Sequence, residues 1–569
     1  MIEWFVKTLQ SNPELAIFLV LALGFALGKI KYKAFTLGTV TSVLLMGVLV
    51  GQLDITVAPL IKSIFFLLFL FSIGFSVGPQ FVHSLRKDGL PQIAFTLILC
   101  TISLGITYAA AVIAGFDTGN AAGLFAGANT NSAVIGIAAD TINQLNISSA
   151  EKSSAVSNIT VAFAVTYIFG TAGTAWFLSA VAPKLLGKDV FAQTKEYEAK
   201  LGGSIAGEEL NTEHAYNGAD FRVVKTDGDF FNEPKTIEEI EKLLLEKGQP
   251  VYVERVRKST GEIIQEPTLN LKIEKGDNIV LNGPIEALIA DEKLLGIEVA
   301  DVELLDFTAE VLKVLVAKKA CGNSFQKLKT CKQRHGVIIR KVQRGNQTIP
   351  MLDKVKIQRG DIVELEGRKN DVERFASYLG YAEKAANTTD ILYMGTAIFL
   401  GGLFGTLAIH AGNVPLSLSA SGGVLFMGII FGWLRSKRPT FGAVPEPAIW
   451  LMNNLGLNVF VAVVGLQAGP DFIAGLKASG INLFVAGIFV SIIPVLVGLF
   501  MGRYIFKFEP AITLGACAGA RTTTASLGSI EEALQSKVPA LSYTTTYAVG
   551  NTLLIVYGAI VVLLLSGAG

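Results

Sequence analysis

Histidine, cysteine and tryptophan are scarce in this chain, with four of each among 569 residues. The four cysteines, Cys100, Cys321, Cys331 and Cys517, have neither the spacing of a zinc site nor the density of a disulfide framework. No segment has the pattern of a phosphate-binding loop, and no set of residues has the pattern of a catalytic triad. A formal net charge of +1 argues against a nucleic-acid partner. These absences predict a protein that is not an enzyme and that needs no cofactor or metal.

Charged residues are also missing from most of the chain. Of the 95 aspartates, glutamates, lysines and arginines, 65 lie between Lys188 and Lys384, which leaves 30 for the other 372 residues. Stretches such as residues 93–114 and 553–565 are too apolar for ordinary soluble helices and favour membrane spans. The first 14 residues lack the basic start of a cleaved signal peptide. We therefore expect two membrane parts, one before and one after a polar central block.

The two apolar flanks carry the same motif. Gly-Ala-Asn-Thr-Asn-Ser at residues 127–132 returns as Gly-Ala-Arg-Thr-Thr-Thr at residues 519–524. Each copy has Gly-x-x-x-Gly-Pro upstream and Thr-Tyr-x-x-Gly downstream, at Gly74, Gly78, Pro79, Thr166, Tyr167 and Gly170 in the first flank and at Gly465, Gly469, Pro470, Thr546, Tyr547 and Gly550 in the second. Glycine-interrupted polar segments at matching places in two hydrophobic halves are typical of a transporter's substrate site. The sequence thus predicts a duplicated membrane unit.

The lysines and arginines of the loops predict the side that each loop faces. The basic loops that this rule places inside are those at residues 29–33, 83–88, 435–438 and 503–507. With these loops inside, residues 123–141 and 514–533 must return to the side they left, so each is predicted to be a re-entrant hairpin. The predicted fold is an α-helical polytopic membrane protein with two inverted repeats of about five spans and one hairpin each. Both chain ends would lie outside, whereas the alternative of twelve full spans would make the repeats parallel.

The tips of the hairpins are the predicted substrate site. A non-helical backbone at membrane depth persists only where protein or a wet cavity satisfies its polar groups. A helix that starts after each tip would offer free N–H groups and hydroxyls to an anion. Arg521 is the only fixed charge in either hairpin core, and its fork of donors fits a carboxylate. The predicted substrate-binding residues are Asn129, Thr130, Asn131, Ser132, Arg521, Thr522, Thr523 and Thr524.

A second set of residues is predicted to shape the hairpins or to gate the site. These residues are Gly127, Gly519, Gly78, Pro79, Gly469, Pro470, Gln80 and Asp471. Structural interpretations compete with these functional ones, because small and polar residues also pack helices together in membranes. Arg521 in particular could be held by a structural partner such as Asp471 or by a cluster of backbone carbonyls.

The polar central block is a duplication of its own. Lys-Gly-Asp-Asn-Ile-Val-Leu-Asn-Gly at residues 275–283 recurs as Arg-Gly-Asp-Ile-Val-Glu-Leu-Glu-Gly at residues 359–367, and β-branched runs before each copy predict strands. We expect two α+β modules, at residues 207–298 and 300–383. Tandem modules of one pattern commonly pair, so we expect them to hold a homodimer together. No residue marks a ligand pocket in them, and an unknown small ligand stays an open alternative.

This combination of motifs resembles the bacterial aspartate:alanine exchanger family. The resemblance rests on the paired motifs at residues 127–132 and 519–524, split by the two Gly-Asp-bearing modules, and it covers nearly the whole chain. The modules are similar to the C-terminal ligand-binding domain of potassium-conductance regulators. The resemblance implies a secondary exchanger of the bacterial inner membrane that swaps aspartate for alanine, with cytoplasmic modules between membrane repeats at residues 1–187 and 388–569. Relatives are thought to export glutamate or succinate.

Three function classes therefore stay in view. The first is an exchanger of small amino acids or carboxylates that works by alternating access. The second is a ligand-gated anion channel, which the regulatory-type modules suggest. The third is a proton- or sodium-coupled uptake carrier, for which Asp140 and Asp471 are the candidate coupling groups.

Overall fold

The structure is a computed structural model. It describes residues 2–29, 31–32, 35–36, 38–84, 89–187, 189–201, 219–246, 251–284, 295–306, 309–317, 319–329, 331–345, 347–382, 388–407, 409–411, 414–416, 419–437 and 442–566. The chain divides into two compact units, of which the first joins Met1–Tyr197 to Ala386–Gly569 and the second is Glu198–Ala385. The second unit coincides with the charged central block of the sequence.

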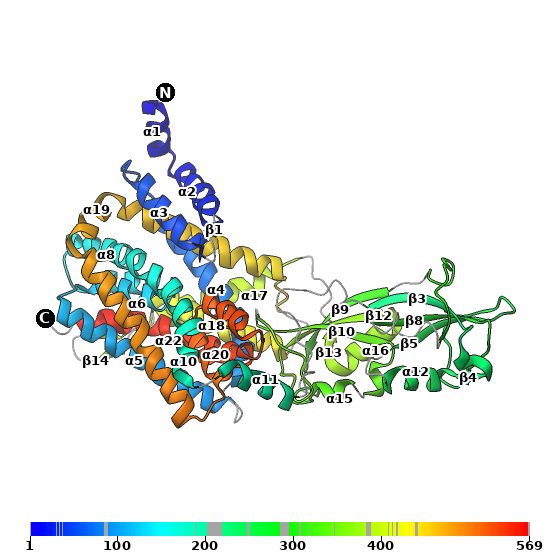
Figure 1. The fold of residues 1–569 in the computed structure, drawn as a ribbon. Coiled ribbons are helices and arrows are strands. Elements are labelled where there is room, and N and C mark those ends of the chain that lie inside the picture. The colour runs from blue at the N-terminus through cyan, green and yellow to red at the C-terminus, as the bar shows by residue number, and fades with distance from the viewer. Residues whose placement is uncertain are drawn as a thin grey trace. The chain divides into compact units, whose positions relative to one another are not determined.

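The first unit is helical, and its first half is coloured blue to teal in Figure 1. Its elements are α1 (Ile2–Ser11), α2 (Pro13–Gly28), β1 (Lys31–Tyr32), β2 (Phe35–Thr36), α3 (Thr39–Gly51), α4 (Pro59–Ser84), α5 (Leu90–Ala114), α6 (Thr118–Ala128), α7 (Ala133–Gln144), α8 (Ser149–Ile168), η1 (Phe169–Gly173), α9 (Thr174–Trp176), η2 (Phe177–Val181), α10 (Ala182–Leu186) and α11 (Val190–Lys200). The segments η1 and η2 are π-helical turns that continue α8 without a loop.

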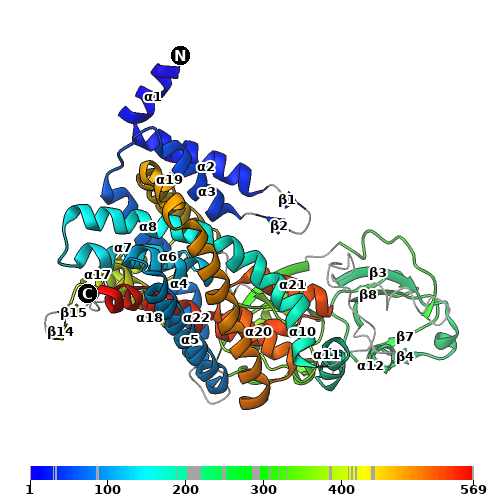
Figure 2. The same ribbon diagram turned by 60° about the vertical axis from the view of Figure 1, so that its left-hand side comes forward.

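The second half of this unit repeats the pattern. Its elements are α17 (Ile391–Gly405), β14 (Ile409–Ala411), β15 (Val414–Leu416), α18 (Ser419–Lys437), α19 (Glu446–Phe500), η5 (Met501–Ile505), α20 (Pro510–Ala520), α21 (Thr524–Leu534) and α22 (Pro539–Ser566). With 55 residues, α19 would be about 80 Å long if straight, which is far more than a bilayer is thick. It contains Pro470 and Pro494, and Figures 1 and 2 show it bending between its gold and orange parts.

Among the described residues, six helical segments are long and apolar enough to cross a membrane, and the bent pair of α1 and α2 would make a seventh. The six segments are Pro59–Pro79, Leu90–Ala114, Ser149–Leu186, Glu446–Pro470, Phe472–Ile505 and Pro539–Ser566. The helices α6, α7, α20 and α21, which flank the two repeated motifs, are not among them. The prediction of a mainly helical protein with several helices capable of crossing a membrane is thus confirmed.

Glycines pack helices of one half against helices of the other. Gly47 and Gly51 of α3 lie against Gly465 and Gly469 of α19, so closely that a Cβ on any of them would meet backbone atoms. In the same way, the glycines of α4 lie against those of α18, namely Gly74, Gly78, Gly428 and Gly432. Each Gly-x-x-x-Gly-Pro motif therefore packs on a Met-Gly-x-x-x-Gly motif of the opposite half, at residues 46–51 and 427–432, a repeat that the sequence analysis missed.

The helices form two groups by their mutual contacts. One group, here called the glycine-packed bundle, contains α2, α3, α4, α17, α18 and α19 up to Pro470. The other, here called the hairpin bundle, contains α5 to α10, α19 from Phe472, α20, α21 and α22. Figure 2 shows α2 and α3 beside the gold part of α19, as the contacts require. Each half of the sequence thus contributes to both bundles.

The described residues of the second unit form two larger antiparallel sheets and the two-stranded antiparallel pair β4-β7. The first has the order β3-β8-β5-β6 and the second the order β11-β10-β12-β9-β13. The strands are β3 (Ala219–Lys225), β4 (Lys235–Thr236), β5 (Tyr252–Arg257), β6 (Ile263–Ile264), β7 (Lys272–Ile273), β8 (Asn278–Pro284), β9 (Ala309–Val316), β10 (Val337–Arg344), β11 (Gln347–Thr348), β12 (Ile362–Arg368) and β13 (Gly380–Ala382). The helices are η3 (Asp229–Asn232), α12 (Ile237–Glu246), α15 (Phe325–Lys329), η4 (Lys332–Arg334) and α16 (Lys369–Leu379).

The two Gly-Asp copies occupy equivalent places in these sheets. Asp277 and Asp361 each lie just before a central strand, β8 and β12 respectively, and both side chains are buried. Asp277 pairs with Lys258 at 2.7 Å, and Asp361 pairs with Arg344 at 2.8 Å. The Gly-Asp motif is therefore a structural turn in which a buried carboxylate ties the start of one strand to its neighbour.

Candidate functional site

The first repeated motif forms the end of α6. The amide of Thr130 donates to the carbonyl of Gly127 at 3.0 Å, and that of Asn131 donates to the carbonyl of Ala126 at 2.9 Å. These are the two hydrogen bonds of a Schellman helix terminus, which normally has glycine in the left-handed position. Here the left-handed residue is Thr130, with a φ of 54°. A β-branched residue is strained in this conformation, so the turn must be held by its surroundings.

The second motif ends α20 with the same geometry. The amide of Thr522 donates to the carbonyl of Gly519 at 2.8 Å, and that of Thr523 donates to the carbonyl of Ala518 at 3.1 Å. Thr522 also has a φ of 54°. The sequence repeat is therefore a repeat of strained backbone turns.

The two tips contact each other through the strained threonines. The hydroxyl of Thr130 donates to the carbonyl of Arg521 at 3.1 Å, and the hydroxyl of Thr522 donates to the carbonyl of Asn129 at 3.2 Å. Since Asn129 and Arg521 hold the same place in the two motifs, the contact is reciprocal. The structure thus brings together two segments that are far apart in the sequence, since Thr130 and Arg521 are separated by 391 positions.

Each tip is followed by a helix that runs back beside the one that led to it. In the first half, Gly119 packs on Ala155 and Gly127 packs on Phe163, so α6 and α8 run in the same direction. The far end of α7 lies near the start of α8, where the ammonium of Lys152 donates to the carbonyl of Asn143 at 2.9 Å. The chain therefore enters through α6, turns at the tip and returns through α7 to the level at which α6 began.

The second half takes the same course. Gly515 of α20 packs on Pro539 and Gly519 packs on Tyr543, so α20 and α22 also run in the same direction. Ser542, in the first turn of α22, donates to the carbonyl of Ile512 in the first turn of α20 at 2.7 Å. Because α22 starts beside the start of α20, α21 must return from the tip to that level.

The tip glycines were predicted to allow close backbone approach. A Cβ on Gly127 would collide with the hydroxyl of Thr166, and a Cβ on Gly519 would collide with the hydroxyl of Thr546. These threonines belong to the Thr-Tyr-x-x-Gly motifs downstream of the two tips. In each half, the tip motif therefore packs directly on the Thr-Tyr-x-x-Gly motif.

Arg521 is buried at the crossing of the tips, with 2% of its surface exposed. Its guanidinium donates to the carbonyl of Ala128 and, at 2.6 Å, to that of Ser491; a longer contact of 3.4 Å reaches Val490. Pro494 has no N–H to bond the carbonyl four residues before it, so the carbonyl of Val490 is available. The cluster of backbone carbonyls foreseen as one partner for Arg521 is therefore present.

These carbonyls leave the charge of Arg521 without a counter-ion. Among the described residues no carboxylate lies within ion-pair distance, and the ionisable groups that act on it are the thiols of Cys100 and Cys517. Its Nε atom is buried and has no hydrogen-bond partner in the described part of the chain. The tip therefore contains a buried positive charge with one free donor.

The other predicted substrate-binding residues fall into two groups. Three are buried and have partners in the protein: Asn129 accepts from Ser103 at 3.0 Å, Asn131 donates to Asn551 at 2.9 Å, and Thr523 accepts from the amide of Ser526 at 3.4 Å as the N-cap of α21. The accessible ones are Thr130, Ser132 and Thr522, which are half-buried, and Thr524, which is exposed. The accessible hydroxyls therefore surround the crossing, while the buried polar groups hold it in shape.

The start of α21 adds a feature that the motif comparison did not single out. Tyr543 lies beside Thr524, and its side chain is buried. The N–H groups of a helix start and the two neighbouring hydroxyls form a polar place next to the crossing. Ser491 and Pro494 were also missed, although a proline inside an apolar run is a visible signal for a freed carbonyl.

The predicted gate residues lie elsewhere. Gly78, Pro79, Gly469 and Pro470 are inside α4 and α19, where the glycines serve helix packing. The side chains of Gln80 and Asp471 lie outside the described part of the structure. A gating role for these residues stays a prediction.

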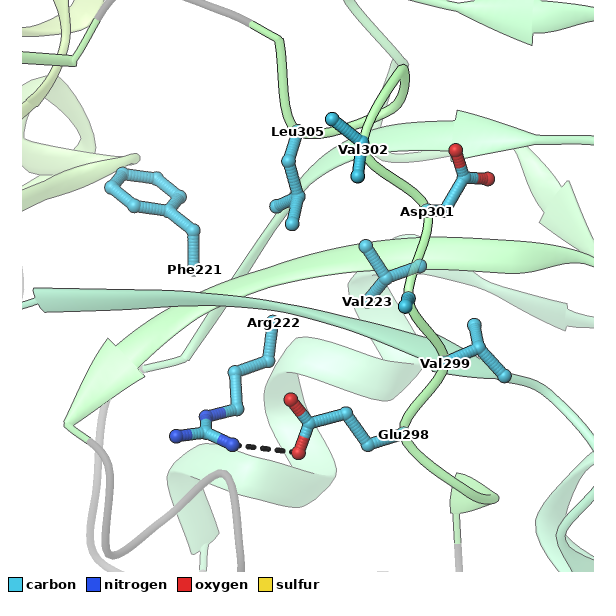
Figure 3. Close-up of a pocket in the computed structure, with 9 residues that line it drawn as sticks. Phe221, Arg222, Val223, Glu298, Val299, Asp301, Val302 and Leu305 are labelled. Atoms are coloured by element: carbon cyan, nitrogen blue, oxygen red, sulfur yellow. Dashed lines mark hydrogen bonds and ion pairs between the residues drawn. The ribbon is translucent and has the colours of Figure 1, made fainter.

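A pocket of about 490 Å³ lies in the second unit, along β3 and the segment at residues 298–305 (Figure 3). Arg222 and Glu298 form an ion pair of 2.6 Å at its edge, and Phe221, Val302 and Leu305 supply apolar surface. The two charges neutralise each other, and the described residues of the unit hold no cluster of metal-ligating side chains. The pocket has no feature that selects a ligand.

Both membrane halves match a known protein family, and relatives match nearly the whole chain. A family model described as "Predicted Permease Membrane Region" matches residues 16–183 and 393–563. An uncharacterized transporter of Shewanella oneidensis is 43% identical over 570 residues, covering 99% of this chain and 100% of the relative. An uncharacterized transporter of Bradyrhizobium diazoefficiens is 35% identical, and the match covers 91% of this chain and 100% of the relative. An uncharacterized transporter of Bordetella parapertussis is 32% identical, and the match covers 99% of this chain and 98% of the relative. No solved structure matches.

Proposed function

Because this chain belongs to the aspartate:alanine exchanger family, whose predicted permease region matches both of its halves, we propose that it is a secondary transporter that exchanges small amino acids or carboxylates. Antiport of aspartate against alanine is the activity that we propose first. The relatives are named only as uncharacterized transporters, and the geometry of the tips supports the choice of substrate.

The observation that carries the proposal is the buried charge of Arg521 without a carboxylate partner. Leaving an ionised group buried and unpaired costs several kcal/mol, roughly 3–5 by the effect of removing one partner from a buried pair. A site that contains such a cation favours an anionic ligand, because the ligand supplies the missing charge. The free Nε donor gives the ligand's carboxylate a direct point of contact.

The surroundings of Arg521 suit a small carboxylate. The hydroxyls of Ser132 and Thr524 and the N–H groups at the start of α21 offer further donors around the crossing. With one fixed cation, the second carboxylate of a dicarboxylate would depend on these hydroxyls and N–H groups. Aspartate and alanine both carry an α-carboxylate, so each could bind Arg521 in turn. The donors near α21 would then distinguish aspartate by its second carboxylate.

Packing between the halves supports the inverted repeats that alternating access needs. Contacts advance together from Phe71 and Gly428 to Phe75 and Gly432, so α4 and α18 run in the same direction. In the repeat, α18 corresponds to α3, and α3 precedes α4 through the short loop at residues 52–58. A helix parallel to α4 is antiparallel to α3, and we therefore infer opposite orientations for the two repeats. Re-entrant hairpins that meet from opposite sides follow from this arrangement.

We further propose that the protein lies in the bacterial inner membrane with both chain ends outside and the modules in the cytoplasm, where they hold a homodimer together. The basic loops support the orientation. The proposal for the dimer is tested by replacing residues 204–385 with a flexible linker. A shortened protein that still runs as a dimer would place the dimer contact in the membrane.

Counterflow in proteoliposomes tests the transport proposal. Vesicles containing the full-length protein are loaded with unlabelled aspartate, diluted, and given labelled alanine outside; rapid labelled uptake is expected only with aspartate inside. Loading with alanine, glutamate or succinate in parallel vesicles identifies the exchanged pair, and export of glutamate or succinate would be seen as exchange with those anions instead. Unitary currents, or no counterflow with any of the four, would contradict an exchanger.

A further inference from the structure

The two bundles contact each other through few elements, and one of these contacts is polar. Helix α7 of the hairpin bundle packs on α18 of the glycine-packed bundle. There the hydroxyl of Ser421 donates to the carboxylate of Asp140. Ser421 is buried and also lies 2.9 Å from the hydroxyl of Ser419, the first residue of α18, which has a φ of 57°. The carboxylate thus meets a specific, strained helix start rather than open surface.

A lysine on a third helix strengthens this contact. Lys62, in the first turn of α4, is half-buried and close enough to Asp140 for electrostatic attraction. It is the only charged residue in the apolar segment Pro59–Pro79. Both α4 and α18 belong to the glycine-packed bundle, so Asp140 is attracted to that bundle from two sides. The contact joins the two bundles near the end of α7, at the level where α4 and α18 begin.

The repeat predicts a counterpart at the other hairpin. Asp140 lies eight positions after Ser132, and Glu531 and Glu532 lie seven and eight positions after Thr524. By the Met-Gly-x-x-x-Gly repeat, Ser421 of α18 corresponds to Val40 in the first turn of α3. Glu531 is half-buried and would therefore be the repeat-related partner of the start of α3.

That second contact is not made in this structure. Among the described residues, α21 has no packing on α3 comparable to that of α7 on α18. The start of α3 nevertheless has hydroxyls that suit a carboxylate, at Thr39, Thr41 and Ser42. The hydroxyl of Ser42 is buried and has no hydrogen-bond partner in the described part of the chain, whereas the hydroxyl of Thr41 lies beside Tyr167 of α8. The two halves, similar at their tips, therefore differ here.

We propose that the contact between Asp140 and Ser421 is one of two alternating gates and is closed in this structure. Glu531 forms the other gate by contacting the first turn of α3, and this gate closes when the first one opens. The proposal rests on transport by alternating access. In a protein of inverted repeats, the opposite state is reached when the halves exchange conformations, so a contact made by one half is expected from the other half in that state. The lysine and arginine count predicts that the Asp140 gate faces outside.

Paired cysteines test the first gate. The natural cysteines are replaced, and Asp140→Cys is combined with Ser421→Cys in the full-length protein. Oxidation is expected to form a disulfide and to slow counterflow at least tenfold, with recovery after reduction. The matched control is Asp117→Cys with Asn158→Cys, a pair within the hairpin bundle whose short side chains contact each other at 2.7 Å and whose disulfide should leave counterflow within twofold. No disulfide at 140 and 421, or full counterflow in the oxidised protein, would overturn the gate.

A four-cysteine variant tests alternation. It adds Val40→Cys and Glu531→Cys to the first pair, and thiols left after oxidation are blocked with iodoacetamide. Intact mass then counts the disulfides in each molecule. Molecules with one disulfide or the other are expected, and molecules with both should be at least tenfold rarer than independent formation predicts. Frequent double disulfides, or no disulfide in a variant that carries only Val40→Cys and Glu531→Cys, would refute the alternating pair.

The same samples separate this proposal from the proposed transport function. Disulfide exclusivity is measured on purified protein without substrate, whereas counterflow is measured on the reduced variants. Loss of counterflow in every reduced variant and in the natural protein would refute transport and leave the gates supported. Normal counterflow with independent disulfides would refute the gates and leave transport supported.

Discussion

Thr130 and Thr522 hold the same place in two hairpin tips, share a φ of 54°, and each donates its hydroxyl to a carbonyl of the other tip. Threonine is a poor residue for a left-handed turn, and both copies accept this strain. Each hydroxyl is positioned by the strained backbone, so the strain and the cross-contact depend on one another. The crossing is therefore a preformed unit and not a chance meeting of two loops.

Substitutions at Thr130 should separate the strain from the hydrogen bond. Thr130→Val keeps the β-branch and loses the donor, so we expect a loss of about 1 kcal/mol in stability. Thr130→Gly also loses the donor but removes the strain in the left-handed turn, and should be more stable than the valine variant. Thr130→Ser keeps the donor without the β-branch and should be at least as stable as the natural protein. Thermal unfolding of the detergent-solubilised protein gives the order, and a valine variant as stable as the glycine variant would contradict it.

Arg521 is expected to be required for exchange. Arg521→Ala should abolish counterflow, and Arg521→Lys should weaken it strongly, because a point charge cannot reproduce the fork of donors. Arg503, half-buried at the end of the long α19–η5 segment, offers a matched control, and Arg503→Lys should exchange normally.

Because Arg521 also holds three backbone carbonyls, its variants could fail by misfolding alone. Substrate-induced thermal stabilisation therefore accompanies the counterflow assay. Inserted Arg521→Lys protein that unfolds like the natural one but gains no stability from aspartate would support a binding role. Wild-type exchange in the alanine variant would end the proposal that Arg521 binds substrate.

The glycines at the tips should not tolerate a methyl group. Gly519→Ala would drive its Cβ into the hydroxyl of Thr546, and overpacking of this kind costs about 1–3 kcal/mol. Gly528, in the same hairpin, has open space around it, and Gly528→Ala in helix α21 should be neutral or slightly stabilising. Thermal unfolding of the two variants side by side measures the difference. Equal stability would mean that the close approach of α20 to α22 is not tight.

The sequence located the tips but not the contacts that hold them. The motif around Gly127 could be recognised because it recurs at Gly519 in a matching apolar context. The partners of Arg521 could not be read in this way, since the carbonyl of Val490 becomes available only when Pro494 meets the tip in space. The periodicity and composition of residues describe one segment of the chain at a time, whereas the contacts of Arg521 join three segments.

The glycine motif of α4 shows the same limit from the other side. Gly74 and Gly78 belong to the Gly-x-x-x-Gly-Pro motif that lies upstream of the tip in both halves, and Gly78 was predicted to shape the hairpin or to gate the site. Their place in the fold is set by Gly428 and Gly432, which are more than 300 residues away and whose own repeat is short. A packing partner of this kind is specified by shape, and a single sequence does not state which glycine pairs face each other.

Thiol labelling should decide the orientation of the membrane halves. Gln144 is exposed at the end of α7, and Lys437 is exposed at the end of α18. In intact cells, an impermeant maleimide should label Gln144→Cys and should spare Lys437→Cys, which becomes reactive after permeabilisation. The background lacks Cys321 and Cys331, which are partly exposed. Labelling of position 437 from outside, with position 144 protected, would refute the orientation predicted from the lysines and arginines.

The contact between the two sheets of the second unit should depend on pH. Glu254 on β5 lies 2.5 Å from the guanidinium of Arg368 on β12, and its side chain is 1% exposed. Burial raises the pKa of Glu254 to about 7 in spite of the attraction to Arg368. Close by, the hydrogen bond with Glu241, at 2.9 Å, raises the pKa of His335.

Both groups hold a proton more tightly in the folded protein than in the unfolded chain. Their contribution to stability is therefore complete below the unfolded pKa values, about 4.3 for glutamate and about 6.5 for histidine, and is lost as the pH rises through the folded values. For Glu254 that loss falls between about pH 4.5 and about 7, and on the order of 3 kcal/mol is at stake. We expect amide exchange in β5 and β10 of the full-length protein, after correction for the intrinsic rate, to be slower at pH 5.5 than at pH 8.

Glu254→Gln should remove most of this difference, because the amide stays neutral at both pH values. Glu303, which is 75% exposed and pairs with Arg257 of β5, provides the control, and Glu303→Gln should leave the pH dependence intact. Equal protection at the two pH values in the natural protein would show that neither Glu254 nor His335 couples proton binding to this contact.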